Sequence, residues 1–165
     1  MRRPPDSSML GQLMGRFPRP GRVDWLGVRP ARDAPVEIRE VVEAVAGKGI
    51  VGDRYAGASG KRGITLIQAE HLSVIAALAG LESLHPAQLR RNVVVSGIPL
   101  LALKGRLFRI GDAVLEGTGP CDPCSKMEAA LGEGAYNAMR GHGGLCARIV
   151  EGGPIRRGDA VVVLD

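Results

Sequence analysis

The sequence predicts a mainly β fold with short helices, an α+β class, in the form of a mixed β-barrel or sandwich with small helices at its rim. Two observations favour this class. Short runs of valine, isoleucine and leucine are separated by glycines, and the 165 residues include 24 Gly and 11 Pro, which favours strands and turns over long helices. The chain also lacks the regular alternation of strands and helices that indicates a doubly wound parallel sheet.

In the first half of the chain, an apolar run at 23–28 predicts a strand, because it ends at an Arg-Pro turn signal. Residues 36–46 mix Val and Ile with charged residues and fit a strand or a helix. Residues 47–63 are polar and rich in glycine, so they predict a loop, and loops of this length are often functional. A buried strand is expected at 64–67.

Residues 69–81 carry apolar side chains at helical spacing and predict the best-defined helix of the chain. A short helix is expected at 86–91, with Pro86 in its first turn, and two brief helices between 125 and 140. Glycines separate the remaining short apolar runs, which predict strands at 93–95, 100–103, 107–110, 113–116, 145–150 and 160–164.

The length corresponds to one domain, which we place at residues 21–165. Residues 1–20 contain several arginines and prolines and are expected to form a flexible basic arm. No apolar run approaches the ~20 residues of a membrane span, so no membrane partner is expected. Three cysteines cannot all be paired within the chain, which favours a reducing, cytoplasmic setting.

The net charge of +5 favours an anionic partner, such as a phosphorylated small molecule, an acidic protein or a nucleic acid. Aromatic residues make up only 3% of the chain, which argues against base stacking and hence against nucleic acid. Outside the arm, the cations gather around residues 52–63 and Arg91. This smaller set suits one phosphate group better than a nucleic-acid backbone.

The chemistry is predicted to lie in the segment 119–128, which contains two of the three cysteines. Ser125 and Glu128 fit a capping box, with Ser125 as the N-cap of a helix. Cys124 then lies directly before the helix, where free backbone amides and the helix dipole stabilise a thiolate, and Lys126 adds positive charge. Because the thiolate is the form that attacks sulfur donors and binds metals, Cys124 is the candidate reactive residue.

Three interpretations of the cysteines remain open at this point. Cys121 and Cys124 fit a C-x-x-C redox pair, although the β-α-β setting of that motif is missing. Cys121, Cys124, His142 and Cys146 have the ligand spacing of a structural zinc site, which would make the protein a binding module with a basic face. In the third interpretation Cys124 works alone, with Cys121 as a helper or bystander and Cys146 as a small buried hydrophobe.

An ordered series of short motifs also runs along the chain from about residue 21 to 163. It comprises Gly52-Asp53-Arg54, Arg62 to Ile67, Arg91-Asn92, Gly97, the G-x-x-x-x-I-G pattern of 105–111, Pro123-Cys124, Gly143-Gly144, Arg148 to Val150, Gly152-Gly153 and Gly158-Asp159. This series resembles the MOSC domain. That domain is found at the C-terminus of molybdenum cofactor sulfurases, in amidoxime-reducing proteins and as small free-standing bacterial proteins.

The resemblance implies a β-barrel related to the barrel domain of pyruvate kinase and a role in molybdenum cofactor chemistry. It implies that Cys124 is a thiolate ligand of molybdenum or carries a persulfide. The implied partners are a molybdopterin-type cofactor and either a sulfur donor, such as a cysteine desulfurase, or an electron-transfer protein. Any catalysis is expected to be the reduction of an N-hydroxylated compound. The chain departs from the family pattern at Arg54-Tyr55, where many members have a histidine.

The glycine-rich loop suggests where a phosphate group binds. Residues 57–63 lack the Gly-Lys-Ser/Thr of a nucleotide triphosphatase, but backbone amides together with Lys or Arg can hold one anionic group. His142 lies in a second glycine loop that can close over a site. Because molybdopterin carries a phosphate, the candidate cofactor contacts are Arg54, Lys61, Arg62, Arg91, Asn92 and Arg148.

Overall fold

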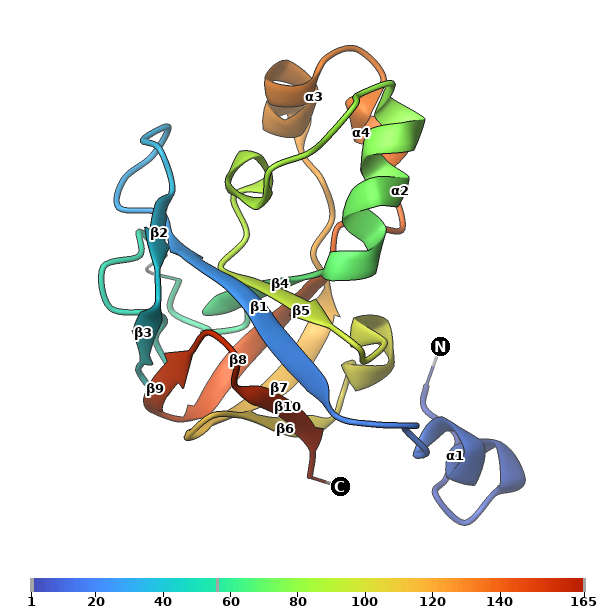
Figure 1. Ribbon diagram of the computed structural model, residues 1–165. Coiled ribbons are helices and arrows are strands. Elements are labelled where there is room, and N and C mark those ends of the chain that lie inside the picture. The colour runs from blue at the N-terminus through green and yellow to red at the C-terminus, as the bar shows by residue number, and fades with distance from the viewer. Residues whose placement is uncertain (1, 56, 165) are drawn as a thin grey trace.

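The computed structural model describes residues 2–55 and 57–164, and their strands close into a barrel (Figure 1). The strands are β1 (Gly21–Val28), β2 (Glu37–Arg39), β3 (Val41–Ala44), β4 (Ile64–Gln68), β5 (Val93–Ser96), β6 (Leu107–Ile110), β7 (Ala113–Pro120), β8 (Leu145–Glu151), β9 (Gly153–Arg156) and β10 (Ala160–Val163). The barrel runs in the order β1, β10, β6, β7, β8, β4, β5 and back to β1. β2 extends the sheet beyond β1, and β3 pairs with β9 in a separate ribbon.

Short helices fill the connections between these strands. They are α1 (Met9–Met14), α2 (Ala69–Ala79), the 3-10 helix η1 (Pro86–Leu89), the 3-10 helix η2 (Leu100–Leu103), α3 (Ser125–Leu131) and α4 (Ala135–Met139). Among the described strands, β4 and β5 form the parallel ladder, and α2 with η1 supplies the crossover that a parallel pair requires. Figure 1 shows α2, α3 and α4 gathered together at one end of the barrel.

Two groups of buried apolar side chains hold these layers together. The larger group fills the barrel and includes Leu66, Val95 and Phe108, and the smaller group lies between the barrel wall and the helices. Successive residues of a strand point to opposite faces, so β4 and β5 contribute to both groups. Leu66 and Val95 point into the barrel, whereas their neighbours Ile67 and Val94 pack against the helical layer.

The predicted fold class is confirmed, and so are the helix at 69–81 and the two brief helices between 125 and 140. Residues 36–46, which fitted either element, contain the strands β2 and β3. The strand expected at 100–103 is wrong, because this segment is the 3-10 helix η2. Leu100 and Leu103 lie three residues apart and both face the core, which suits the three-residue turn of a 3-10 helix.

The predicted basic arm contains α1, and its end is attached to the barrel. The guanidinium of buried Arg106 donates to the Met14 carbonyl at 3.0 Å and lies over the ring of Phe17, 5.8 Å from its centroid. Phe17 itself packs against the barrel core. Arg19 adds a further contact between the arm and the domain, since its Nε donates to the Gly97 carbonyl at 3.5 Å.

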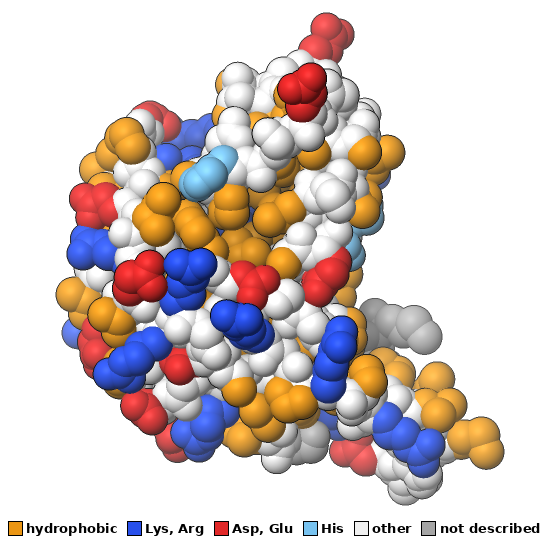
Figure 2. Space-filling view, in the orientation of Figure 1, with side chains coloured by type: hydrophobic (Ala, Val, Ile, Leu, Met, Phe, Trp, Pro, Cys, Tyr) orange, Lys and Arg blue, Asp and Glu red, His pale blue; other side chains and the backbone are white. Residues whose placement is uncertain are grey.

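The surface of one face is mixed in charge. Figure 2 shows Lys and Arg side chains interspersed with Asp and Glu over the barrel, and hydrophobic side chains gathered beneath the helical layer. This face therefore lacks the continuous basic surface that a nucleic-acid backbone requires. Within residues 2–55 and 57–164, no helix combines the length and the apolar character needed to cross a membrane.

Candidate functional site

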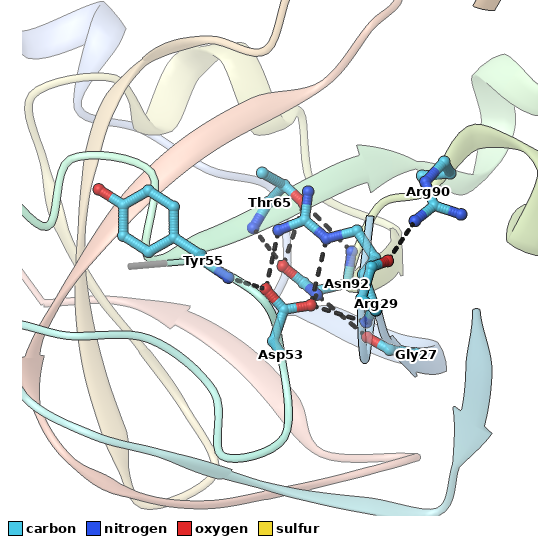
Figure 3. Close-up of polar contacts among 8 residues, drawn as sticks. Gly27, Arg29, Asp53, Tyr55, Thr65, Arg90 and Asn92 are labelled. Carbon is cyan, nitrogen blue, oxygen red and sulfur yellow. Dashed lines mark hydrogen bonds and ion pairs between the residues drawn. The ribbon is translucent and has the colours of Figure 1, made fainter. Parts of the chain in front are cut away.

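A buried carboxylate fastens the long glycine-rich loop to the barrel. Asp53 accepts hydrogen bonds from the backbone N–H of Arg29 at 2.7 Å, and from its guanidinium through Nε at 3.1 Å and Nη2 at 2.8 Å (Figure 3). The Asp53 side chain is fully buried. Burial raises the pKa of this carboxyl group, but the hydrogen bonds and charge of Arg29 lower it more, so the pKa lies below its ordinary value.

Asn92 connects the same loop to two strands of the barrel wall. Its Nδ2 donates to Asp53 and to the carbonyl of Gly27 in β1, each at 3.1 Å. Its Oδ1 accepts from the backbone N–H and the hydroxyl of Thr65 in β4, again at 3.1 Å each (Figure 3). We call Arg29, Asp53, Thr65 and Asn92 the polar hub. Asn92 was a predicted cofactor contact, but its side chain is committed to this internal network.

Arg91 lies next to Asn92 and holds three segments by their backbone carbonyls. Its Nε donates to Gly143 at 2.9 Å, Nη1 to Leu89 at 3.1 Å and Nη2 to Cys121 at 3.1 Å. The side chain is buried. A Cβ atom at residue 143 would lie 2.1 Å from the carbonyl oxygen of Cys121, so only glycine allows this close approach. Arg91, also a predicted cofactor contact, thus positions the segment that contains the cysteines.

Two of the three cysteines meet where the ends of β7 and β8 adjoin. The backbone N–H of Cys121, just beyond β7, donates to the Gly144 carbonyl at 2.8 Å. Cys146 in β8 lies opposite Gly119 in β7. Both cysteines are buried, and the Cys146 thiol donates to the Pro120 carbonyl at 3.9 Å. The two thiols also shift each other's pKa, so their side chains interact. We call Cys121 and Cys146 the thiol pair.

The two thiols of this pair differ strongly in acidity. The interaction with the Cys146 thiol lowers the pKa of Cys121, burial opposes this, and the charges of Arg91, Arg62 and Arg29 lower the pKa further, to about 6. The same interaction, together with burial, raises the pKa of Cys146 far above its ordinary value. Cys121 therefore carries the negative charge near neutral pH, while Cys146 keeps its proton.

Cys124, the predicted reactive residue, is an exposed free thiol. It is itself the N-cap of α3, and its side chain makes no capping hydrogen bond. The capping box predicted for Ser125 and Glu128 is therefore wrong. The Glu128 carboxylate instead accepts from the backbone N–H groups of Gly134 at 3.1 Å and Tyr136 at 3.0 Å, which lie at the start of α4 and lower its pKa.

The glycine-rich loop returns to the same end of the barrel. The hydroxyl of Thr118 contacts the carbonyls of both Lys61 and Cys146, so the loop lies beside the thiol pair. The charge of Arg62 acts on both thiols. A hollow of about 470 Å³ lies against this loop and is lined by Gly47, Lys48, Tyr55, Gly57 and Ala58.

The remaining predicted cations differ in how they are held. Arg54, Lys61 and Arg62 are exposed and have no ion-pair partner among the described residues. Arg148 is partly buried, and its Nη1 lies 3.4 Å from Oε1 of Glu116. Three of the four cations thus remain available to an anionic ligand.

The four residues of the zinc hypothesis do not come together. The ring of His142 packs edge-on against that of His71, with 5.0 Å between centroids, and Cys124 is exposed whereas Cys121 and Cys146 are buried. In the part of the chain that the structure describes, no three His, Cys, Asp or Glu residues are grouped so that they could hold a metal ion. The C-x-x-C hypothesis also changes, because the thiol that interacts with Cys121 is that of Cys146.

Two features of this region are absent from the sequence-based prediction. Arg29, which neutralises Asp53, has no local motif that marks it as special. The Cys121–Cys146 contact depends on the pairing of β7 with β8, and the expected strands at 113–116 and 145–150 leave this pairing open.

Comparison with known proteins supports the family predicted from the motifs. The family model of the MOSC domain, a family linked to molybdenum cofactor chemistry, matches residues 51–162, more than half of the chain. No curated protein matches the sequence.

Solved structures share the fold. The YuaD protein from Bacillus subtilis is 23% identical, with a TM-score of 0.77, over 88% of this chain and 96% of its own. YiiM from Geobacillus stearothermophilus is 16% identical, with a TM-score of 0.70, over 88% of this chain and 76% of its own. YiiM from Escherichia coli is 17% identical, with a TM-score of 0.71, over 90% of this chain and 71% of its own. With the barrel, the ordered motifs and the matched residues in agreement, the chain belongs to the MOSC domain family.

Proposed function

We propose that this domain binds a molybdopterin-type cofactor, with Cys124 as a thiolate ligand of molybdenum or as the carrier of a persulfide. The observation that carries the proposal is the position of Cys124. It is the exposed one of the three free thiols, and it lies three residues from Cys121, inside the segment matched by the MOSC family model. Thiolate is a soft ligand that suits either role.

The residues around the cysteines fit the anionic part of such a cofactor. Lys61 and Arg62 belong to a glycine-rich loop that lies beside the thiol pair, and neither has an ion-pair partner among the described residues. Arg54 is exposed on the same loop. Backbone amides and unpaired cations together can hold one phosphate group. We therefore assign Arg54, Lys61 and Arg62, with Arg148 beside them, to the phosphate of the cofactor.

The bound cofactor would supply a metal centre for two-electron chemistry, such as reduction of an N-hydroxylated compound. The protein's own residues have simpler tasks. Arg91 and the polar hub keep the cysteine segment and the loop in register, and the exposed thiol of Cys124 remains accessible to a metal or a sulfur donor. The partner is then a cysteine desulfurase or an electron-transfer protein in a reducing cytoplasm, where free thiols persist.

The test is cofactor retention in a host that makes molybdenum cofactor. Purified wild type, Cys124→Ser and Cys121→Ser are compared by molybdenum content, by pterin fluorescence after oxidation, and by intact mass for persulfide. We expect Cys124→Ser to lower molybdenum or persulfide by about tenfold or more, because the soft ligand is lost. If Cys124→Ser keeps all of its molybdenum and persulfide and only Cys121→Ser loses them, the proposal has assigned the role to the wrong thiol.

A further inference from the structure

We infer that Cys121 and Cys146 form a second reactive site, a dithiol that a small hydroperoxide converts reversibly into an internal disulfide. The inference concerns residues outside the Cys124 assignment. It stands on the pairing of β7 with β8, on the contact between the two thiols and on the cations around them, so it holds whether or not the domain binds a cofactor.

The barrel brings the two cysteines to adjoining strand ends. β7 and β8 are antiparallel, with Gly119 opposite Cys146, and the chain continues so that the Cys121 N–H donates to Gly144. Cys121 and Cys146 are therefore diagonal neighbours across the pair, close enough for their thiols to interact. Disulfide formation requires the two strand ends to move closer, because diagonal neighbours lie at the outer limit of the Cα separation that a disulfide spans.

The surroundings supply the other requirement, a stabilised thiolate on one of the two sulfurs. The guanidinium of Arg91 holds the Cys121 carbonyl and also lies near its sulfur, and Arg62 adds a second positive charge. The Cys146 thiol donates to the Pro120 carbonyl at 3.9 Å, and its interaction with Cys121 raises its pKa. One sulfur is thus prepared to attack and the other holds the proton that a leaving group needs, which is the division of labour of a reactive dithiol.

The chemistry balances with one equivalent of hydroperoxide. The Cys121 thiolate attacks a peroxide oxygen, the O–O bond breaks, and the hydroxide that leaves takes the proton of Cys146, which gives a sulfenic acid and water. The Cys146 thiolate then attacks the sulfur of Cys121, the S–O bond breaks, and the second hydroxide takes from solvent the proton that Cys121 released on ionisation, which gives the second water. Two thiols have lost two electrons and two protons in total, and the peroxide is reduced to two waters.

Burial determines which oxidants can react. Cys121 is 1% exposed and Cys146 4% exposed, so the pair is closed to bulky reagents and open only to molecules close to water in size. Cys124 is exposed and should react with both kinds of reagent. Hydrogen peroxide and a large aromatic disulfide reagent therefore distinguish the two kinds of thiol in the native protein.

The experiment treats native protein with hydrogen peroxide, alkylates the remaining thiols and maps the peptides. We expect an internal link between Cys121 and Cys146, a mass lower by two hydrogens, and full recovery of both thiols with a dithiol reductant. Cys124→Ser is the matched control, since it removes the exposed thiol, and it should form the same link. Cys121→Ser and Cys146→Ser should each lower the yield of internal disulfide by about tenfold or more.

Three outcomes would overturn the inference: a Cys121–Cys124 link, links between molecules only, or oxidation confined to Cys124. The link mapped in wild type and in Cys124→Ser decides the question even if Cys146→Ser does not fold. Failure of the link leaves the cofactor assay of Cys124 untouched. Conversely, loss of molybdenum retention with an intact Cys121–Cys146 link would count against the proposed function alone.

Discussion

Two neighbouring parts of this barrel use polar residues in opposite ways. The polar hub buries the Arg29–Asp53 ion pair, and its carboxylate and amide groups are engaged by donors or acceptors inside the protein. The thiol pair is also buried, but two of the three cations that act on Cys121, Arg91 and Arg62, have no carboxylate partner among the described residues. Arg91 and Asn92, adjacent in the chain, belong to the two different parts.

The difference shows that some motif residues of this family stabilise the fold, whereas others surround a group that can react or bind a ligand. Matched charges in a buried network stabilise a single geometry, because breaking one contact leaves a buried charge alone. Positive charges without a carboxylate partner stabilise an anion that forms or binds reversibly, here a thiolate or a phosphate. Three predictions test this division, and the first has the largest expected effect.

Asp53→Asn should destabilise the fold by about 3 kcal/mol, because it leaves the guanidinium of Arg29, whose side chain is only 17% exposed, without its counter-charge. The measurement is the free energy of unfolding in a denaturant titration. Asp33→Asn is the matched control, because Asp33 pairs with Lys126 on the exposed surface, and its midpoint should hardly move. Equal midpoints for the two variants would remove the distinction between hub and surface.

Stability should fall in acid, and part of the fall should be traceable to Asp53. Its folded pKa lies below the unfolded value, so its contribution is complete above the unfolded pKa and is lost as the pH falls through the folded pKa. The difference in unfolding free energy between wild type and Asp53→Asn should therefore be constant near neutral pH and narrow below about pH 4. A difference that stays constant down to pH 2 would show that the carboxylate charge is unimportant.

Arg62→Gln should leave stability unchanged and make Cys121 less acidic, because the charge of Arg62 lowers the pKa of that thiol. The readout is the pH dependence of the reaction of Cys121 with hydrogen peroxide, followed by alkylation of the remaining thiols and peptide mapping. Near pH 6 the rate at Cys121 should fall about two- to fivefold, as expected for loss of one partly screened charge. Lys61→Gln, the neighbouring substitution, is the control, and an identical shift there would deny Arg62 its specific role.

The sequence predicted a useful part of this site. The loop at 47–63 and the position of Cys124 before a helix follow from local patterns, because glycine content and apolar spacing act within a few residues. The capping box at Ser125 failed for a related reason. Glu128 has the right spacing for α3, but the backbone N–H groups of Gly134 and Tyr136 compete for its carboxylate, and they become neighbours only when the two helices pack.

Local patterns therefore determined that this chain is a glycine-rich β-barrel of the MOSC family with a cysteine segment near residue 124 and a basic loop. Only the tertiary structure decided which of those residues face inward. Arg91 and Asn92 are polar in the sequence but buried in the fold, and Cys121 meets Cys146 across 25 residues of chain. Strand register and burial arise from contacts distant in sequence, and they set both the partner of a side chain and the sign of its pKa shift.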